Sequence, residues 1–312
     1  MTNNGRSGGT AVLVVDEAGP VGAGDPSGAA VRSALADGVR RLAEHEAAAP
    51  AGDPEGVHQL RAAARRLRGV LHTFAPLLDE SWAEALSDDL RGPSHALGAV
   101  RDLDVLRDRL KDSAAELADA LGPLWAALDA RHEAASASLR DHLRAESHRA
   151  LLARLADAAH APRLTAAAEG PCRDVLPTLV ADAWKALAKR ARDLGPDSAD
   201  ADYHEARKRA KRARYAAEAV APALGAGARK RAERFARRVE GLQDVLGEHQ
   251  DAVVARDEVE RVARDHPGDA PFLLAAGRLV ERQARAARAA RDDFARAWED
   301  IDQKKRRRWM KP

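Results

Sequence analysis

The chain has 312 residues, of which 32% are charged and 4% aromatic, and its formal net charge at pH 7 is only +2. Its one cysteine, Cys172, excludes an intramolecular disulfide bond and a zinc site built on thiolates. No stretch approaches the roughly 20 apolar residues that cross a bilayer, and the first residues lack the pattern of a signal peptide, so we expect a soluble, cytoplasmic protein.

The predicted elements are all helical, because apolar residues recur with a 3.6-residue period between charged ones. Residues 1–26 are rich in glycine and small residues, which predicts a disordered segment. The third helix after this segment is expected to bend at Gly92-Pro93. The helices are expected at residues 27–48, 54–77, 80–112, 122–160, 172–193, 198–222, 227–264 and 269–303.

A junction at residues 161–171, which contains two prolines and a glycine, divides these helices into two sets of four. Short loops between antiparallel neighbours predict an all-α fold of two pseudo-symmetric four-helix bundles, with a first repeat at 27–160 and a second at 171–303. Residues 304–312 are strongly basic and are expected to form a disordered tail that binds anions loosely.

One pattern of histidine and arginine occurs twice. Residues 58–68 and 204–214 both read His-x-x-Arg-x-x-x-(Arg/Lys)-Arg-x-Arg, at an offset of 146 residues. On a helical wheel, each copy places most of its cations on one stripe beside an apolar arc. Neither copy has an acidic residue among its arginines, so nothing local neutralises the guanidinium groups. The duplication therefore predicts two related halves that present one cationic surface.

A second internal match supports the duplication. Residues 97–102 (Leu-Gly-Ala-Val-Arg-Asp) resemble residues 246–251 (Leu-Gly-Glu-His-Gln-Asp) at an offset of 149 residues, and Gly92 and Gly241 keep the same offset. A glycine inside a helix costs about 1 kcal/mol relative to alanine, so repeated glycines suggest that helices approach each other closely. The aspartate that ends each copy is placed to orient a basic side chain, but two carboxylates are too few for a metal site.

These motifs resemble those of the CHAD family. The resemblance is carried by Val57–Arg68, Leu97–Val105, His204–Tyr215 and Leu242–Gly247, in the expected order, and extends over about residues 27–303. That family is described as two pseudo-symmetric four-helix bundles that bind inorganic polyphosphate on a basic surface at the junction of the bundles. The resemblance implies a non-catalytic polyphosphate-binding protein without a cofactor or metal, and polyphosphate granules as a candidate partner.

The resemblance also implies the site. By motif position, the expected polyphosphate contacts are His58, Arg61, Arg65, Arg66, Arg68, His204, Arg207, Lys208, Lys211, Arg212 and Arg214. His72, on the same helical stripe as His58, and Arg101 are also expected in the site. Arginine grips phosphate oxygens with a rigid fork, and lysine supplies a mobile point charge. The second copy carries Glu218 where the first carries His72, so the two stripes differ at their far ends. Many relatives carry a triphosphate-tunnel (CYTH) domain, whose motifs are absent from this sequence, so we expect a stand-alone module.

Two alternatives remain open at this stage. Basic helices also suit a nucleic-acid-binding protein, although the stripes offer only Tyr203 and Tyr215 as aromatic platforms for bases. A phosphate-handling enzyme would use His58 or His204 as a phosphoryl acceptor or general acid. The remaining histidines without repeat partners are expected on the surface; they are His45, His95, His132, His142, His148, His160 and His266.

Overall fold

The computed structural model describes residues 19–46 and 54–311. Within them, helices are joined by short turns and 3₁₀ segments, with two isolated β-bridges and no strand. The prediction of an all-α fold is therefore confirmed. The α-helices are α1 (Ser27–Glu46), α2 (Pro54–Thr73), α3 (Glu80–Asp89), α4 (Arg91–Ala114), α5 (Gly122–Arg144), α6 (Glu146–His160), α7 (Cys172–Ala191), α8 (Asp200–Val220), α9 (Ala226–Asp265) and α10 (Ala270–Ile301).

Two of the expected helices are each divided in two. The helix expected at 80–112 breaks at Leu90 into α3 and α4, which places Pro93 in the first turn of α4. A proline is tolerated there because the first N–H groups of a helix have no intrahelical partner. The helix expected at 122–160 breaks at Ala145, whose backbone is extended, into α5 and α6. The bend expected at Gly92-Pro93 is thus a helix boundary at Leu90, two residues before Gly92.

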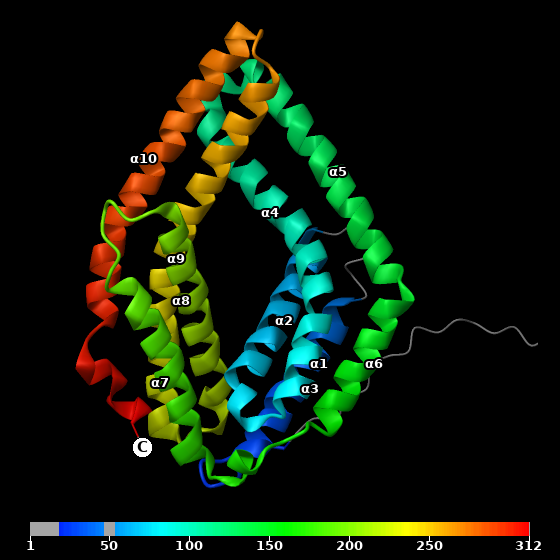
Figure 1. Ribbon diagram of the computed structural model, residues 1–312, viewed down its shortest axis with the longest axis vertical. Coiled ribbons are helices and arrows are strands. Elements are labelled where there is room, and N and C mark those ends of the chain that lie inside the picture. Colours follow the sequence, from blue (N-terminus) through cyan, green and yellow to red (C-terminus); the bar gives the residue numbers. More distant parts are fainter. Residues whose placement is uncertain (1–18, 47–53, 312) are drawn as a thin grey trace, which may run out of the picture.

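The two halves of the chain are joined at both ends of the molecule. In Figure 1, α2 and α8 approach each other near the bottom, while α4 and α5 meet α9 and α10 near the top. The larger core contains residues from both halves, including Leu67 of α2 and Ala213 of α8. A second core at the top packs leucines of α4 and α5 against α9 and against Phe272 of α10. The halves therefore cannot separate without exposing apolar surface.

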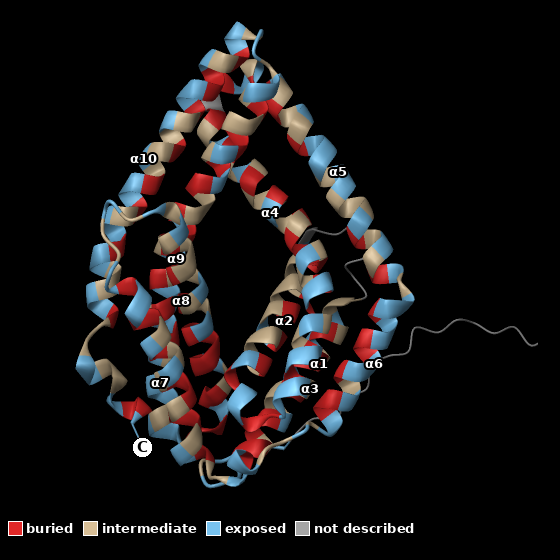
Figure 2. Ribbon diagram, viewed as in Figure 1, coloured by how far each residue is buried: buried red, intermediate tan, exposed pale blue. Residues whose placement is uncertain are grey.

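The predicted apolar arcs of the two basic helices are the faces that pack into the core. In α2 this face consists of large residues such as Leu60 and Leu67, whereas in α8 it is mostly alanine, including Ala206 and Ala210. Figure 2 shows how buried and exposed residues alternate along both helices. Small residues on α8 let neighbouring helices lie close to its axis. The arginines of both helices are consequently held on rigid, well-packed elements.

The helices α2 and α8 approach each other closely at Gly69. A β-carbon built there would lie 3.1 Å from two side-chain atoms of Tyr215, which is tighter than ordinary packing. Tyr215 occupies the position 146 residues after Gly69, the same offset as between the two histidine–arginine copies. The two basic helices therefore cross where one contributes no side chain and the other contributes a tyrosine.

A buried polar network fixes the first turn of α8. Asp200 Oδ1 accepts a hydrogen bond from Arg291 of α10 at 2.6 Å and lies 3.1 Å from Nε2 of His249 on α9. The His249 ring stacks on Tyr203 with 4.6 Å between centroids, and its burial lowers its pKa. Burial opposes ionisation of Asp200, but hydrogen bonds from Arg291 and Arg256 outweigh it and lower the pKa of this carboxyl. The start of α8 is thus tied to both following helices.

The segment before α1 differs from its prediction. Residues 1–18 lie outside the described residues, but residues 19–26 are ordered against the start of α7. The carbonyl of Asp25 accepts a hydrogen bond from the Cys172 amide, and that of Ala23 accepts one from the Arg173 amide, each at 2.9 Å. The expectation of disorder is therefore wrong for residues 19–26, because long-range backbone hydrogen bonds hold them.

The C-terminal basic segment is ordered as well. Lys304–Met310 form a 3₁₀ segment, η6, and Trp309 and Met310 are buried in the larger core. The guanidinium of Arg307 lies over the ring of Trp184, 4.5 Å from its centroid. The expected disordered tail is wrong for residues 304–311, because two large apolar side chains anchor them; Pro312 lies outside the described residues. No helix within the described ranges is long and apolar enough to span a bilayer.

Candidate polyanion-binding site

The cationic faces of α2 and α8 point toward each other. Lys211 of α8 feels the charges of Arg61 and Arg65 on α2 as well as that of Arg207 on its own helix. Burial and these three guanidinium groups lower the pKa of Lys211 to about 7. Arginines of α2 can affect a lysine of α8 in this way only if the two stripes converge. We call Arg61, Arg65, Arg207 and Lys211 the inner cluster.

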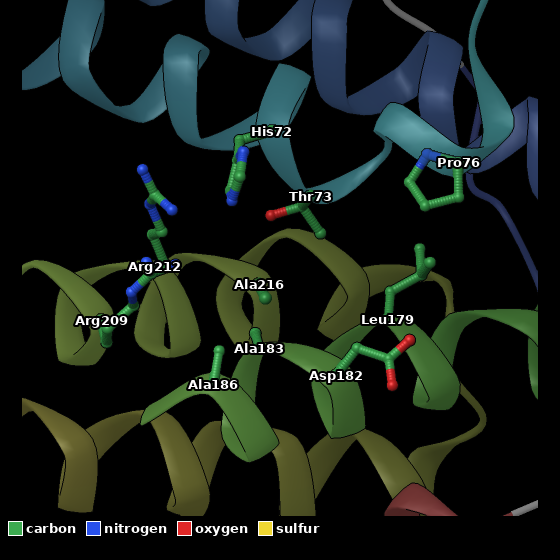
Figure 3. Close-up of a pocket in the computed structure, with 10 residues that line it drawn as sticks. All are labelled: His72, Thr73, Pro76, Leu179, Asp182, Ala183, Ala186, Arg209, Arg212 and Ala216. Atoms are coloured by element: carbon green, nitrogen blue, oxygen red, sulfur yellow. The ribbon is translucent and has the colours of Figure 1, made fainter. Parts of the chain in front are cut away.

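A second group of cations lies toward the C-terminal end of α2. Burial and the nearby guanidinium groups of Arg212 and Arg209 lower the pKa of His72. Arg68 of α2 and Arg209 also lower the pKa of Arg212, whose burial is the larger cause. Figure 3 shows His72 projecting from α2 toward Arg212 of α8, across a pocket of about 220 Å³. We call Arg68, His72, Arg209 and Arg212 the outer cluster.

Two arginines of the inner cluster are oriented by carboxylates. Nη2 of Arg61 lies 2.7 Å from Oδ1 of Asp102 on α4, and Nη2 of Arg207 lies 3.8 Å from Oδ1 of Asp251 on α9. Asp102 and Asp251 are the aspartates that end the repeated Leu-Gly motif. Each half thus uses the same pair of motif positions to hold an arginine, as the spacing suggested.

The repeated glycines of that motif lie against the same arginines. A β-carbon at Gly98 would be 3.9 Å from the Arg61 guanidinium, and one at Gly247 would be 3.6 Å from that of Arg207. What approaches each glycine is therefore a guanidinium group, not a helix backbone as the sequence suggested. The other repeated glycines are not equivalent, since Gly92 lies under His142 of α5 whereas nothing approaches Gly241.

Several predicted site residues have no carboxylate partner within the part of the chain that the structure describes. They are Arg65, Arg66, Arg68, Arg101, Lys211 and Arg212. The Nε atoms of Arg65 and Arg68 are also buried without a hydrogen-bond partner, as is Nδ1 of His58. The counterpart of His58 differs, because Nδ1 of His204 lies 2.6 Å from the side-chain oxygen of Gln250. Cations without a carboxylate partner among the described residues therefore come from both helices.

Arg214 is set apart from the other predicted site residues. Its side chain is only 11% exposed, donates a hydrogen bond to Glu240 of α9 at 2.6 Å and lies 3.4 Å from Glu218. The guanidinium also lies over the ring of Tyr215. Arg214 thus holds α8 against α9. Lys208, which is exposed, pairs with Glu205 on its own helix.

The structure adds one residue, Arg209, that the sequence prediction left out. Arg209 lies off the cationic stripe of α8 on a helical wheel, yet it faces His72 in the outer cluster. Its basic neighbours Arg207 and Lys208 were the available signal.

One of the histidines expected on the surface is instead buried. His148 is 4% exposed, and its Nε2 lies 3.2 Å from Glu46.

The two tyrosines of the second copy are both in the core, Tyr203 at 1% exposure and Tyr215 at 7%. Neither presents a ring face to solvent on which a base stacks.

Across the described residues, no group of three or more histidine, cysteine or acidic side chains is placed to hold a metal ion.

Two curated relatives match most of this chain. They are Uncharacterized protein MT2285 and Uncharacterized protein Rv2226, from two strains of Mycobacterium tuberculosis, and each is 29% identical over 304 residues. The match covers 91% of this chain but 54% of each relative, so the chain spans about half the length of these proteins. The expectation of a stand-alone module stays a prediction.

Two solved structures share the fold. PptA from Streptomyces chartreusis superposes with a TM-score of 0.75 at 24% identity, covering 88% of this chain and all of that one. The CHAD domain from the plant Ricinus communis superposes with a TM-score of 0.72 at 25% identity, covering 92% of this chain and 96% of that one. The family model described as CHAD domain matches residues 33–260. This chain belongs to the CHAD family.

Proposed function

We propose that this protein binds inorganic polyphosphate along the surface between α2 and α8, and that it does so without cleaving the polymer. The observation that carries the proposal is the set of unpaired cations contributed by both helices, with Arg65 and Lys211 in the inner cluster and Arg68 and Arg212 in the outer one. Fold and family membership support it, because the CHAD family is linked to polyphosphate.

The shape of the site suits a linear polymer of phosphate. From Arg61 to His72, the cations of α2 extend over roughly 17 Å, at a rise of 1.5 Å per residue. A polyanion with one charge on every unit can meet such a row of cations in many registers, and needs no deep pocket. Arginine forks bind phosphate oxygens in pairs, so Arg65 and Arg68 are the expected anchors on α2.

The surroundings of the histidines favour binding over catalysis. A catalytic histidine is usually oriented by a carboxylate that fixes its tautomer. Among the described residues, Nδ1 of His58 has no hydrogen-bond partner, and Nδ1 of His204 faces the amide oxygen of Gln250. A phosphate-release assay with polyphosphate and with a nucleoside triphosphate tests this part of the proposal, and we expect no turnover.

The burial of Tyr203 and Tyr215 favours polyphosphate over a single-stranded nucleic acid. Aromatic stacking contributes roughly 1–3 kcal/mol per base in proteins that bind single strands, and these rings are inaccessible. We therefore expect long-chain polyphosphate to displace bound single-stranded DNA at low concentration, and the reverse competition to be poor.

The direct test is titration of the protein with long-chain polyphosphate at several salt concentrations. An Arg65→Gln/Arg68→Gln variant is compared with an Arg149→Gln/Arg264→Gln variant, which removes the same charge from exposed positions on α6 and α9. At about 1.5 kcal/mol per charge-assisted contact, the first variant loses about 100-fold in affinity. Its salt slope also falls by about one unit per lost contact.

Two results would contradict the proposal. One is an absence of polyphosphate binding at low salt, and the other is an equal loss of affinity in the control variant. The second result would mean that net charge, and not the arrangement of cations on α2 and α8, governs the interaction.

A further inference from the structure

Lys211 occupies an unusual place in the candidate site. Its partly buried ammonium group is on α8, one helical turn after Arg207, and within electrostatic reach of Arg61 and Arg65 of α2. Arginine side chains remain charged at every pH that proteins experience. The amine of Lys211 is therefore subject to permanent positive charge from both helices.

The nearest carboxylates do not compensate this charge. Asp102 of α4 and Asp251 of α9 both interact electrostatically with Lys211, but each is paired with an arginine, Asp102 with Arg61 and Asp251 with Arg207. Within the described ranges, Lys211 makes no ion pair or hydrogen bond through its ammonium group. A partly buried ammonium with three unused donors is costly.

The inner cluster as a whole therefore favours the neutral amine of Lys211. Desolvation disfavours the charged form first, the three guanidinium groups add to this effect, and Asp102 opposes it weakly, so the pKa falls to about 7. Near neutral pH, the free protein is a mixture of molecules with and without this proton. A bound anion would reverse the balance, because it brings negative charge and hydrogen-bond acceptors to the amine.

We propose that Lys211 takes up a proton when a polyanion binds between α2 and α8, so that the affinity of the protein rises as the pH falls. This inference rests on the proposed function and adds a regulatory property to the same site. The reason is reciprocal linkage, since a ligand that stabilises the charged form must bind that form more tightly. The free energy of binding then depends on how many molecules already carry the proton.

The size of the effect follows from the protonated fraction of Lys211. If bound polyphosphate keeps the amine fully charged, about half a proton is taken up per site at pH 7. Because affinity follows the protonated fraction of Lys211, it falls about tenfold between pH 6 and pH 8. Other titrating groups, including the polymer's terminal phosphates, add a background that must be subtracted.

Isothermal titration calorimetry with long-chain polyphosphate measures the proton directly. The binding enthalpy at pH 7 is recorded in buffers of different ionisation enthalpy, and its slope gives the number of protons taken up. A Lys211→Arg variant keeps the positive charge but does not titrate, and the histidines and the ligand are the same in both proteins. The difference between wild type and this variant is therefore the contribution of Lys211. Lys189→Arg, at an exposed position on α7, is the matched control.

We expect wild type and Lys189→Arg to take up about half a proton more than Lys211→Arg. Equal proton uptake in all three proteins, with binding intact, would overturn the inference and leave the proposed function standing. A lack of polyphosphate binding by wild type at low salt would instead remove the proposed function itself, and this inference with it.

A second measurement follows the titration of Lys211 in the wild-type protein and uses a variant only to assign the signal. Reductive methylation with a ¹³C label gives each lysine of the wild-type protein an NMR signal that titrates with pH, and the Lys211 signal is assigned from its loss in Lys211→Gln. We expect this signal to titrate near neutral pH in the free protein, and at much higher pH with polyphosphate bound. Titration near the ordinary lysine value of 10.5 in the free protein would refute the inference.

Discussion

The crossing of α2 and α8 at Gly69 sets how far apart the two cationic stripes lie. A Gly69→Leu substitution tests this, because even a β-carbon there would be 3.1 Å from Tyr215. Replacing glycine by leucine inside a helix gains about 1 kcal/mol in helix propensity, whereas overpacking a filled core costs about 1–3 kcal/mol or more. Since a whole isobutyl group must be accommodated, we expect a net loss of about 1–2 kcal/mol in the free energy of unfolding.

The assay is urea unfolding followed by circular dichroism, together with polyphosphate titration. The matched control is Gly241→Leu on α9, where a β-carbon would have no neighbour within 4 Å, and the same propensity gain should stabilise the protein. Polyphosphate affinity should fall several-fold in Gly69→Leu and stay unchanged in Gly241→Leu, because only the first substitution pushes α2 away from α8.

A double-mutant cycle isolates the contact. Tyr215→Ala alone leaves a cavity and destabilises the protein, but it also makes room for a leucine at position 69. Gly69→Leu should therefore cost less in the Tyr215→Ala background, with a coupling energy of at least about 1 kcal/mol. If the two effects add to within roughly 0.5 kcal/mol, the side chains do not compete for the same space and the reasoning about the crossing is wrong.

Three further substitutions have defined outcomes. Lys211→Met should raise the free energy of unfolding at pH 7 by about 1–2 kcal/mol, after allowance for partial solvent exposure. Because the pKa of Lys211 is lowered in the folded protein, this gain is complete below about pH 7 and vanishes near 10.5, as urea unfolding across this pH range will show. Glu240→Gln should cost about 1–3 kcal/mol in the same assay, since it removes a hydrogen-bonded charge partner of buried Arg214; no loss would mean that Glu218 suffices. Trp309→Ala should release η6, so that trypsin cleaves among its basic residues, as mass spectrometry of the digest will show; protection equal to wild type would contradict the anchoring role.

The helical architecture followed from the sequence because helix periodicity is a local property. The apolar faces of α2 and α8 are the ones the helical wheel predicted, and proline and glycine marked most of the turns. The break at Leu90 lies just before Gly92-Pro93, which marked it, whereas the break at Ala145 carries no such mark, since alanine favours helices. The sequence therefore predicted a disruption near Leu90 and gave no local signal at Ala145.

The site was predictable to the extent that it repeats. Duplication of the histidine–arginine pattern indicated two helices with related stripes, and the repeated aspartates indicated carboxylates that orient a basic side chain. The structure identifies those side chains as Arg61 and Arg207. Arg214 sits at the edge of its stripe, and its partner Glu240 comes from the next helix, 26 residues later. Ion pairs between helices of this kind depend on tertiary packing and leave no trace in the local pattern.

For the C-terminal segment, the prediction made from composition was wrong. A run of lysine and arginine suggested a disordered tail, but two large apolar residues follow the arginines of this run. Trp309 and Met310 bury enough apolar surface to hold the segment in place, and Arg307 gains a cation–π contact with Trp184. A few large apolar residues therefore outweigh the composition around them.

The arrangement of the cations has an energetic consequence for the whole molecule. Unpaired guanidinium groups such as Arg65 and Arg68 repel one another and the cations of α8, and this repulsion destabilises the free protein. The fold resists it because α2 and α8 cross at Gly69, and because their neighbours α4 and α9 are joined through the second core at the other end of the molecule. Under the proposed function, a bound polyanion would relieve this repulsion. Because the fold already fixes the cations, little of the binding energy would be lost in ordering the site.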